Sequence, residues 1–168
     1  MYLGKNGQRV LRILHMGAAA SWLGSALCVL LLLHEAPLSG EDEELFGMLK
    51  SAAVITQQVL VPVGVFGTFF TGLAYSLCTR RGFFKYPWIA CKWCITAALI
   101  LGTLYLCPQA GQELDAVYRY GLSAYRLPDT AERHFRRELG CAAGAGLLAA
   151  AVVLSVCRPG EKSVPPQS

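Results

Sequence analysis

The sequence has little charge for its length. Of its 168 residues, 15% are Asp, Glu, Lys or Arg, whereas soluble domains carry about 25%. Hydrophobic residues make up 54%, and the net charge is +4. The basic residues are dispersed around apolar stretches and form no continuous basic face, which argues against nucleic acid as a partner. The composition indicates one integral membrane domain whose charges report its topology.

Several enzyme motifs are also missing from the sequence. It contains no G-x-x-x-x-G-K, G-x-G-x-x-G, H-E-x-x-H or G-x-S-x-G. No Asp or Glu lies within an apolar stretch, which argues against a carboxylate proton relay. The seven cysteines lie within or at the edges of apolar stretches, where a free Cys behaves as a small hydrophobe. No Cys-rich loop predicts a disulfide framework.

Four apolar stretches are long enough to cross a membrane as helices, which takes about 20 residues for hydrocarbon about 30 Å thick. They are 10–33, 51–78, 88–106 and 139–157. They predict an all-α, four-helix transmembrane bundle in a single domain, 1–158, with a disordered cytoplasmic tail, 159–168. The first stretch follows a basic lead, as a signal peptide does. It exceeds the usual apolar core of about 7–15 residues and three more stretches follow, so we interpret it as an uncleaved helix.

Prolines and acidic residues indicate where the elements begin and end. Pro37 ends the first helix, because the residue before a proline disfavours helical backbone. A short surface helix is expected before the second stretch, where four acidic residues from Glu41 suit a first helical turn. Pro62 predicts a kink in the second helix. Another surface helix is expected from Thr130, before the fourth stretch.

The distribution of charge predicts the topology. The segments 1–12, 79–87 and 158–168 hold eight basic residues against Glu161 alone. The segments 34–50 and 108–138 hold six basic and ten acidic residues. By the positive-inside rule, both termini are cytoplasmic.

His15 and Lys92 are the ionisable side chains closest to the apolar interior. His15 follows Arg12 by three residues and Lys92 follows Pro87 by five, so both are expected about one turn inside the cytoplasmic interface. Such groups usually face the bundle interior. A neutral imidazole is a ready haem-iron or metal ligand, and a lysine can hold a propionate or quinone oxygen. Alternatively, Lys92 extends to the interface and His15 hydrogen-bonds a neighbouring carbonyl.

The first and second predicted helices carry further residues that could line a site with His15 and Lys92. Trp22 follows His15 by two turns, and one face of the second helix carries Gly64, Thr68, Thr71 and Tyr75. Such faces let helix backbones approach closely, or they make room for a flat cofactor. We assign Trp22, Thr68 and Tyr75 to the same candidate cofactor site as His15 and Lys92.

Other polar residues are interpreted as structural or solvated. His34 ends the first stretch and is expected to be solvated there, with haem ligation as the alternative. His134 lies among arginines on a surface helix and is expected to be solvated or to face lipid headgroups. Cys91 and Cys94 form a C-x-x-C near a helix start, but no βαβ context supports a redox motif, and packing is expected. Cys107 and Cys141 both fall near the outer face, where a disulfide bridge between them is the alternative to free cysteines.

Three short motifs carry a family resemblance over residues 10–106. The run L-H-M-G-A-A-A-S-W-L-G occupies 14–24, Pro62 precedes Thr71-Gly72, and the third helix opens W-x-x-x-K from Trp88. The chain resembles small four-helix bacterial membrane proteins: an uncharacterised integral membrane family (a domain of unknown function) and, more distantly, HemJ-type protoporphyrinogen oxidases and copper-resistance D proteins. The HemJ resemblance implies haem b bound through His15 and a requirement for Lys92. The fourth stretch lacks the later HemJ-type segments, so protoporphyrinogen oxidation itself is not expected.

The first functional expectation is a small membrane redox protein with haem b or a quinone within the bundle. His15 is the expected axial or metal ligand, and Lys92 is its electrostatic partner. Two other classes stay open: a non-catalytic subunit or stabiliser of a larger membrane complex, and a small-solute or metal permease formed by homo-oligomerisation. The expected location is the bacterial cytoplasmic (inner) membrane, in contact with lipid.

Overall fold

The computed structural model describes residues 4–78 and 87–157, and these contain helices and no strand. Four helical runs are long and apolar enough to cross a membrane, which confirms the predicted all-helical fold with four such helices. The elements are α1 (Lys5–Glu35), η1 (Ala36–Leu38), α2 (Asp42–Ile55), the π-helical η2 (Thr56–Phe66), α3 (Gly67–Cys78), α4 (Pro87–Tyr120), the 3₁₀-helical η3 (Gly121–Arg126) and α5 (Pro128–Cys157).

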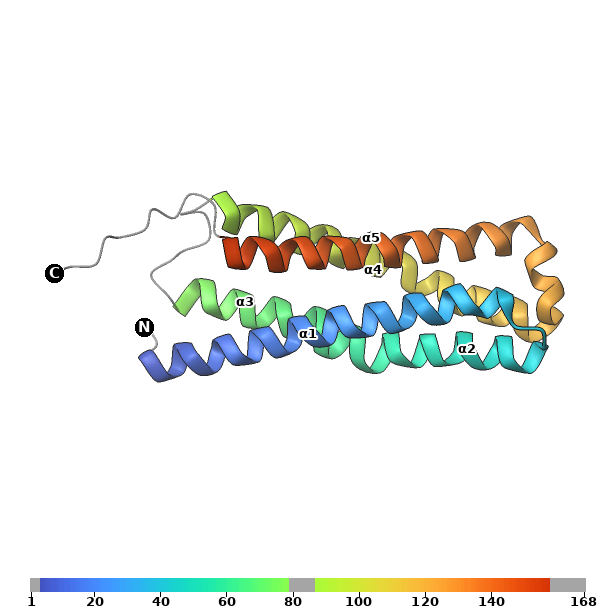
Figure 1. Cartoon of the computed structure of the whole chain (residues 1–168), viewed down its shortest axis with the longest axis horizontal. Coiled ribbons are helices and arrows are strands. Elements are labelled where there is room, and N and C mark those ends of the chain that lie inside the picture. Colours follow the sequence, from blue (N-terminus) through green and yellow to red (C-terminus); the bar gives the residue numbers. More distant parts are fainter. Residues whose placement is uncertain (1–3, 79–86, 158–168) are drawn as a thin grey trace.

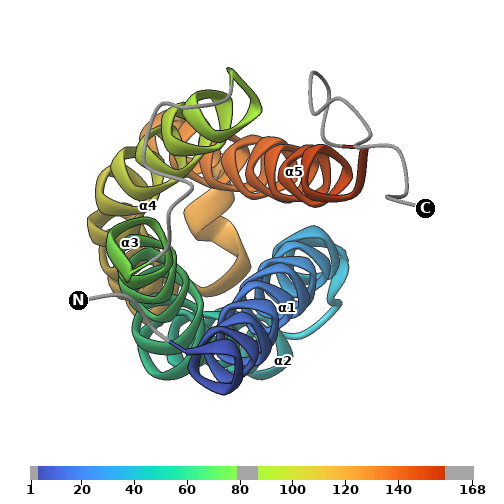
Figure 2. The ribbon, with the colours of Figure 1, turned by 90° about the vertical axis from the view of Figure 1, so that its left-hand side faces the viewer.

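The helices lie along one another in an elongated bundle (Figure 1). α1 packs against α2, η2 and α3, whereas α4 packs against α5, and α1 also contacts α5. α1 begins and α5 ends at the same end of the bundle, with the end of α3 and the start of α4 beside them. We call this the His15 end. The opposite end, where η1 and η3 make the turns, is the Glu113 end. Figure 2 views the bundle from the His15 end.

The helices extend beyond the predicted stretches. α2, η2 and α3 follow one another without a break from Asp42 to Cys78, and these 37 residues would be about 55 Å long as an α-helix. A hydrocarbon core is about 30 Å thick, so part of this run projects from it. The segment expected as a separate surface helix before the second stretch is the first part of this run. The segment expected before the fourth stretch is likewise the beginning of α5.

Two prolines lie inside helices. Pro62 lies within η2, whose wider π-helical turns are a known way of interrupting the regular ladder of an α-helix. Pro108 lies within α4, which continues to Tyr120 although the apolar stretch was expected to end at Leu106. The extension past Pro108 buries Val117, which is 2% exposed, so tertiary packing supports it.

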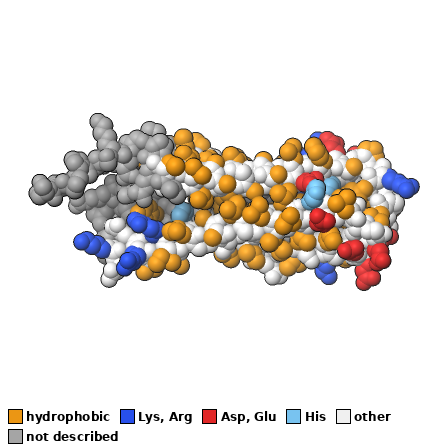
Figure 3. Space-filling model, in the orientation of Figure 1, with side chains coloured by type: hydrophobic (Ala, Val, Ile, Leu, Met, Phe, Trp, Pro, Cys, Tyr) orange, Lys and Arg blue, Asp and Glu red, His pale blue; other side chains and the backbone are white. Residues whose placement is uncertain are grey.

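Charged side chains mark the limits of the apolar interior. The charge-free stretches of the four helical runs are 13–33, 51–78, 93–112 and 139–157, and we treat these as the membrane-spanning segments. On the face in Figure 3, acidic and basic side chains gather toward the two ends, and apolar side chains cover the middle. The predicted loop 79–87, apart from Pro87, and the predicted disordered tail 159–168 lie outside the described residues.

The most buried side chains gather toward the Glu113 end. Leu33 and Leu45 are fully buried there, and Leu49 is nearly so. Toward the His15 end, α3 has no fully buried residue. Between the two ends, α1 and η2 approach closely at Gly64, where an added Cβ would lie 2.8 Å from the Cβ of Trp22. A residue without a side chain is therefore needed at this crossing.

Candidate functional site

His15 is held between α1 and α3 by a short hydrogen-bonded chain. It is half-buried, and its Nδ1 lies 2.9 Å from the Oγ1 of Thr71. The Thr71 hydroxyl donates to the carbonyl oxygen of Gly67 at 2.6 Å. Because a hydroxyl has only one hydrogen, His15 must be the donor in the other bond. The neutral imidazole therefore carries its proton on Nδ1 and a lone pair on Nε2.

The backbone of α3 lies close to the His15 side of α1. A Cβ added at Gly72 would lie 3.4 Å from Cε1 of His15, and one added at Gly67 would lie 3.1 Å from the Cβ of Ala18. One turn before Gly72, the hydroxyl of Thr68 is buried and has no hydrogen-bond partner among the described residues. Buried polar atoms are normally satisfied, so this hydroxyl can bind a further polar group.

Lys92 is held by a different pair of helices. Its Nζ donates to the Oγ of Ser155 at 2.6 Å, which links α4 to α5. The same Nζ lies 5.9 Å from the centre of the Trp88 ring, within the range of a cation–π contact. The hydrogen bonds of His15 and Lys92 thus lead to separate helices, α3 and α5. The sequence did not predict the Ser155 contact.

Trp22 and Tyr75, the other predicted site residues, lie on α1 and α3. Trp22 is 3% exposed and packs against the backbone at Gly64. The Tyr75 hydroxyl accepts a long hydrogen bond, 3.5 Å, from the Arg12 guanidinium. Trp22 therefore has a clear packing role, whereas Tyr75 places a polar group near the first turns of α1.

No family model, curated protein or solved structure matches this chain. What His15 can bind is therefore inferred from the atoms around it. Among the described residues, no group of three or more His, Cys, Asp or Glu side chains could hold a metal ion. The cysteines are all free, and Cys91 and Cys94 are exposed on α4 instead of being packed in the bundle. Among the described residues of the candidate site, the His15 imidazole is the side chain suited to ligate a metal.

A buried ionic cluster at the Glu113 end was missed from the sequence. Glu113 of α4 is fully buried, and Arg137 and His134 of α5 are 5% and 7% exposed. Arg137 Nη1 donates to one oxygen of Glu113, and His134 Nδ1 donates to the other at 2.6 Å. The Tyr125 hydroxyl donates to that same second oxygen at 2.9 Å. The prediction that His134 is solvated or faces headgroups is therefore wrong, because its ring is needed to satisfy a buried carboxylate.

This cluster keeps Glu113 ionised. Glu113 follows the charge-free stretch 93–112 and lies outside the membrane-spanning segments as we define them. Burial acts to raise the pKa of Glu113, but the hydrogen bond from His134 and the positive charge of Arg137 outweigh it, so the pKa is lowered. The cluster joins α4, η3 and α5, which is a structural role. The spacing of His134 and Arg137 by three residues puts them on one helical face, and this is the one sequence signal that could have indicated a shared partner.

Proposed function

We propose that this chain is a small multi-pass membrane protein that binds haem b through Nε2 of His15 and takes part in electron transfer. The observation that supports this is the hydrogen-bonded chain from His15 through Thr71 to Gly67. Histidines that ligate metals usually donate their other ring N–H to a fixed acceptor, which sets the tautomer and the orientation of the ring. Thr71 is such an acceptor, and it leaves the Nε2 lone pair for iron.

The surrounding side chains fit a haem in chemistry. The buried Thr68 hydroxyl lacks a partner among the described residues and can donate to a polar group of the cofactor. Lys92 supplies positive charge suited to a propionate. When bound, haem b supplies reversible one-electron chemistry. His15 would be its only histidine ligand, because His34 and His134 lie on the segments that form the Glu113 end.

The proposal includes an orientation in the bacterial cytoplasmic membrane. The segments 1–12, 79–87 and 158–168, which adjoin in sequence the helix ends at the His15 end, are rich in Lys and Arg, whereas ten acidic residues lie in the segments 34–50 and 108–138. The positive-inside rule then places the His15 end on the cytoplasmic side. The haem would lie about one turn inside that interface.

The test is an absorbance spectrum of the detergent-purified full-length protein, oxidised and then reduced with dithionite. Haem is supplied during expression and again after purification. We expect a Soret band and a reduced α-band in the wild type, and loss of both in His15→Ala. His34→Ala is the matched control, because it removes a histidine of the same helix at the other end of the bundle and should keep the spectrum.

Two results would overturn the proposal. One is a wild-type protein that stays colourless although haem was supplied. The other is a spectrum that His15→Ala leaves unchanged in a folded protein, as judged by size-exclusion chromatography. A colourless protein that co-purifies with a stable membrane partner would support the alternative of a non-catalytic subunit, with His15 as a packing residue.

A further inference from the structure

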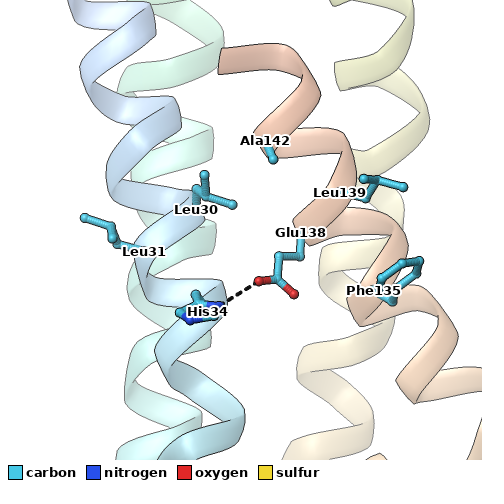
Figure 4. A pocket seen from close by; sticks show the side chains of 7 residues that line it. All are labelled: Leu30, Leu31, His34, Phe135, Glu138, Leu139 and Ala142. Atoms are coloured by element: carbon cyan, nitrogen blue, oxygen red, sulfur yellow. Dashed lines mark hydrogen bonds and ion pairs between the residues drawn. The ribbon is translucent and has the colours of Figure 1, made fainter. Parts of the chain in front are cut away.

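A groove lies between α1 and α5 near the Glu113 end. It has a volume of about 470 Å³, within the range of small-molecule pockets. Apolar side chains dominate its lining, namely Leu30, Leu31, Phe135, Leu139 and Ala142. In Figure 4, Leu30 and Ala142 face the space between the two helices. Because 13–33 and 139–157 are charge-free, the groove runs along helices that lipid surrounds.

One polar pair closes the groove toward the Glu113 end. His34 Nδ1 lies 2.8 Å from Oε1 of Glu138, and the two side chains point toward each other from α1 and α5 (Figure 4). Their side chains are 62% and 31% exposed, so both keep atoms that can bind a further group. The pair stands just beyond the charge-free stretches, at the depth where the polar head of an amphiphile would lie.

The charges of the lining restrict what that head can be. No Lys or Arg of the described residues lines the groove, and Glu138 repels a phosphate, so an anionic lipid head is disfavoured. The carboxylate accepts hydrogen bonds and the imidazole donates or accepts them. A neutral head that both donates and accepts suits this pair, and a phenolic hydroxyl of a quinol does both. An isoprenoid tail suits the leucine-lined remainder.

We propose that this groove binds a lipid-soluble isoprenoid quinol, with a ring hydroxyl donating to Glu138 and His34 completing the polar end. This inference goes beyond the haem proposal and does not depend on it. His34 and His15 are 19 residues apart on α1, which is about 28 Å along the helix. Each site can therefore fail or succeed alone.

The experiment uses a photoreactive azido-quinone with a short isoprenoid tail, reduced to the quinol. The probe is added to the full-length protein in phosphatidylcholine nanodiscs, and labelled peptides are mapped by mass spectrometry. We expect labels within 30–34 and 135–142. An unlabelled short-chain quinol should compete with the probe, whereas added phosphatidylethanolamine or phosphatidylglycerol should not.

Three variants make the test specific. Glu138→Gln removes the charged acceptor and should lower labelling about tenfold, the size expected for a hydrogen bond to a charged group. Ala142→Trp fills the groove and should abolish labelling. Glu132→Gln is the matched control, because Glu132 is exposed on the same helix and pairs with Arg136; its labelling should equal that of the wild type. Folding of each variant is checked by size-exclusion chromatography.

The proposal is overturned if folded Glu138→Gln labels like the wild type, or if the labels map elsewhere. It is also overturned if phospholipid displaces the probe as well as the quinol does, since the groove would then hold only bulk lipid. If Ala142→Trp fails to fold, Glu138→Gln against Glu132→Gln decides the question alone. The label in His15→Ala should be unchanged, which separates this result from the outcome of the haem test.

Discussion

The two ends of the bundle hold their histidines in opposite ways. At the Glu113 end, His134 and His34 each contact a carboxylate, Glu113 or Glu138. At the His15 end, the imidazole contacts a neutral hydroxyl that is itself fixed by a backbone carbonyl. The carboxylate of Glu138 raises the pKa of His34 through a hydrogen bond and its negative charge. The Thr71 hydroxyl, whose own hydrogen is already used, instead holds one neutral tautomer of His15.

The two ends also differ in how deeply their side chains are buried. The fully buried side chains, with Leu33 and Leu45 among them, lie toward the Glu113 end, whereas α3 at the other end has no fully buried residue. Leu45 also precedes the charge-free stretch 51–78, so the core continues past the membrane-spanning segments. We infer that the buried ionic cluster around Glu113 holds α4, η3 and α5 together, and we call this cluster the clamp. The His15 end is less tightly packed, and it is where we propose that the haem binds.

The largest effect is expected from breaking the clamp with Glu113→Gln. The variant leaves Arg137 buried without its counter-charge, and the loss of one partner of a buried ion pair costs about 3–5 kcal/mol. The free energy of unfolding, measured by denaturation in detergent, should fall by about that amount. The control is Glu132→Gln on α5, whose pair with Arg136 is exposed and should contribute less than about 1 kcal/mol. Equal losses in the two variants would contradict the clamp.

Acid should remove the stabilisation by ionised Glu113 from the wild-type protein, because it protonates the carboxylate. The pKa of Glu113 is lowered from its ordinary 4.5, so the cluster stabilises the fold above the unfolded pKa and loses that contribution as pH falls through the folded pKa. The difference in melting temperature between wild type and Glu113→Gln should be constant above about pH 5 and shrink below it. A difference that stays the same down to about pH 3 would show that the charge of Glu113 is not what stabilises this end.

Sequence patterns alone predicted the fold well and the clamp poorly. The apolar stretches predicted the four helices, because a charge-free span of about 20 residues is typical of a helix that crosses a membrane. The prediction ended the third helix near Leu106, because a longer polar segment, 108–138, follows the apolar stretch. The structure continues α4 past Pro108, and this extension carries Glu113 into the core. Its charged partners, His134 and Arg137, are 21 and 24 residues away, and no local pattern links Glu113 to them across that separation.

Sequence patterns indicate some residues of the candidate site but not the contacts between them. His15 was identified from its type and depth, and Thr68 and Tyr75 from one helical face, because such faces follow from the helical period. The contacts of these residues depend on how the helices are arranged. Ser155 as the partner of Lys92 and Thr71 as the partner of His15 both lie on other helices, and no spacing within one helix indicates them.

The crossing between the two ends should be sensitive to a single methyl group. In Gly64→Ala the new Cβ would meet the Cβ of Trp22 at 2.8 Å and its Cα at 2.9 Å, so the helices must move apart. Overpacking of this kind costs about 1–3 kcal/mol, to be measured by denaturation as above. Gly24→Ala on α1 is the control, since nothing lies within 4 Å of its added Cβ, and it should not destabilise. A similar melting temperature for the two variants would mean that this crossing is loosely packed.

The smallest and most informative change is Thr71→Val at the His15 end. Valine keeps the shape of threonine but removes the acceptor for His15 Nδ1. The free energy of unfolding should fall by about 0.5–1.5 kcal/mol, the usual contribution of one hydrogen bond. Haem affinity, measured by titration of the Soret band, should fall about tenfold or more, as for other partners of metal-ligating histidines.

Thr68→Val is the matched control for Thr71→Val, one helical turn away on α3. The Thr68 hydroxyl is buried and has no partner within the described part of the chain, so its removal should leave the stability of the haem-free protein unchanged or raise it. If the two variants lose stability equally in the haem-free protein, Thr71 acts by packing and does not fix the tautomer. A loss of haem-free stability confined to Thr71→Val, together with its loss of haem affinity, would instead mean that the threonine sets which nitrogen of His15 faces the ligand, as the hydrogen-bonded chain to Gly67 requires.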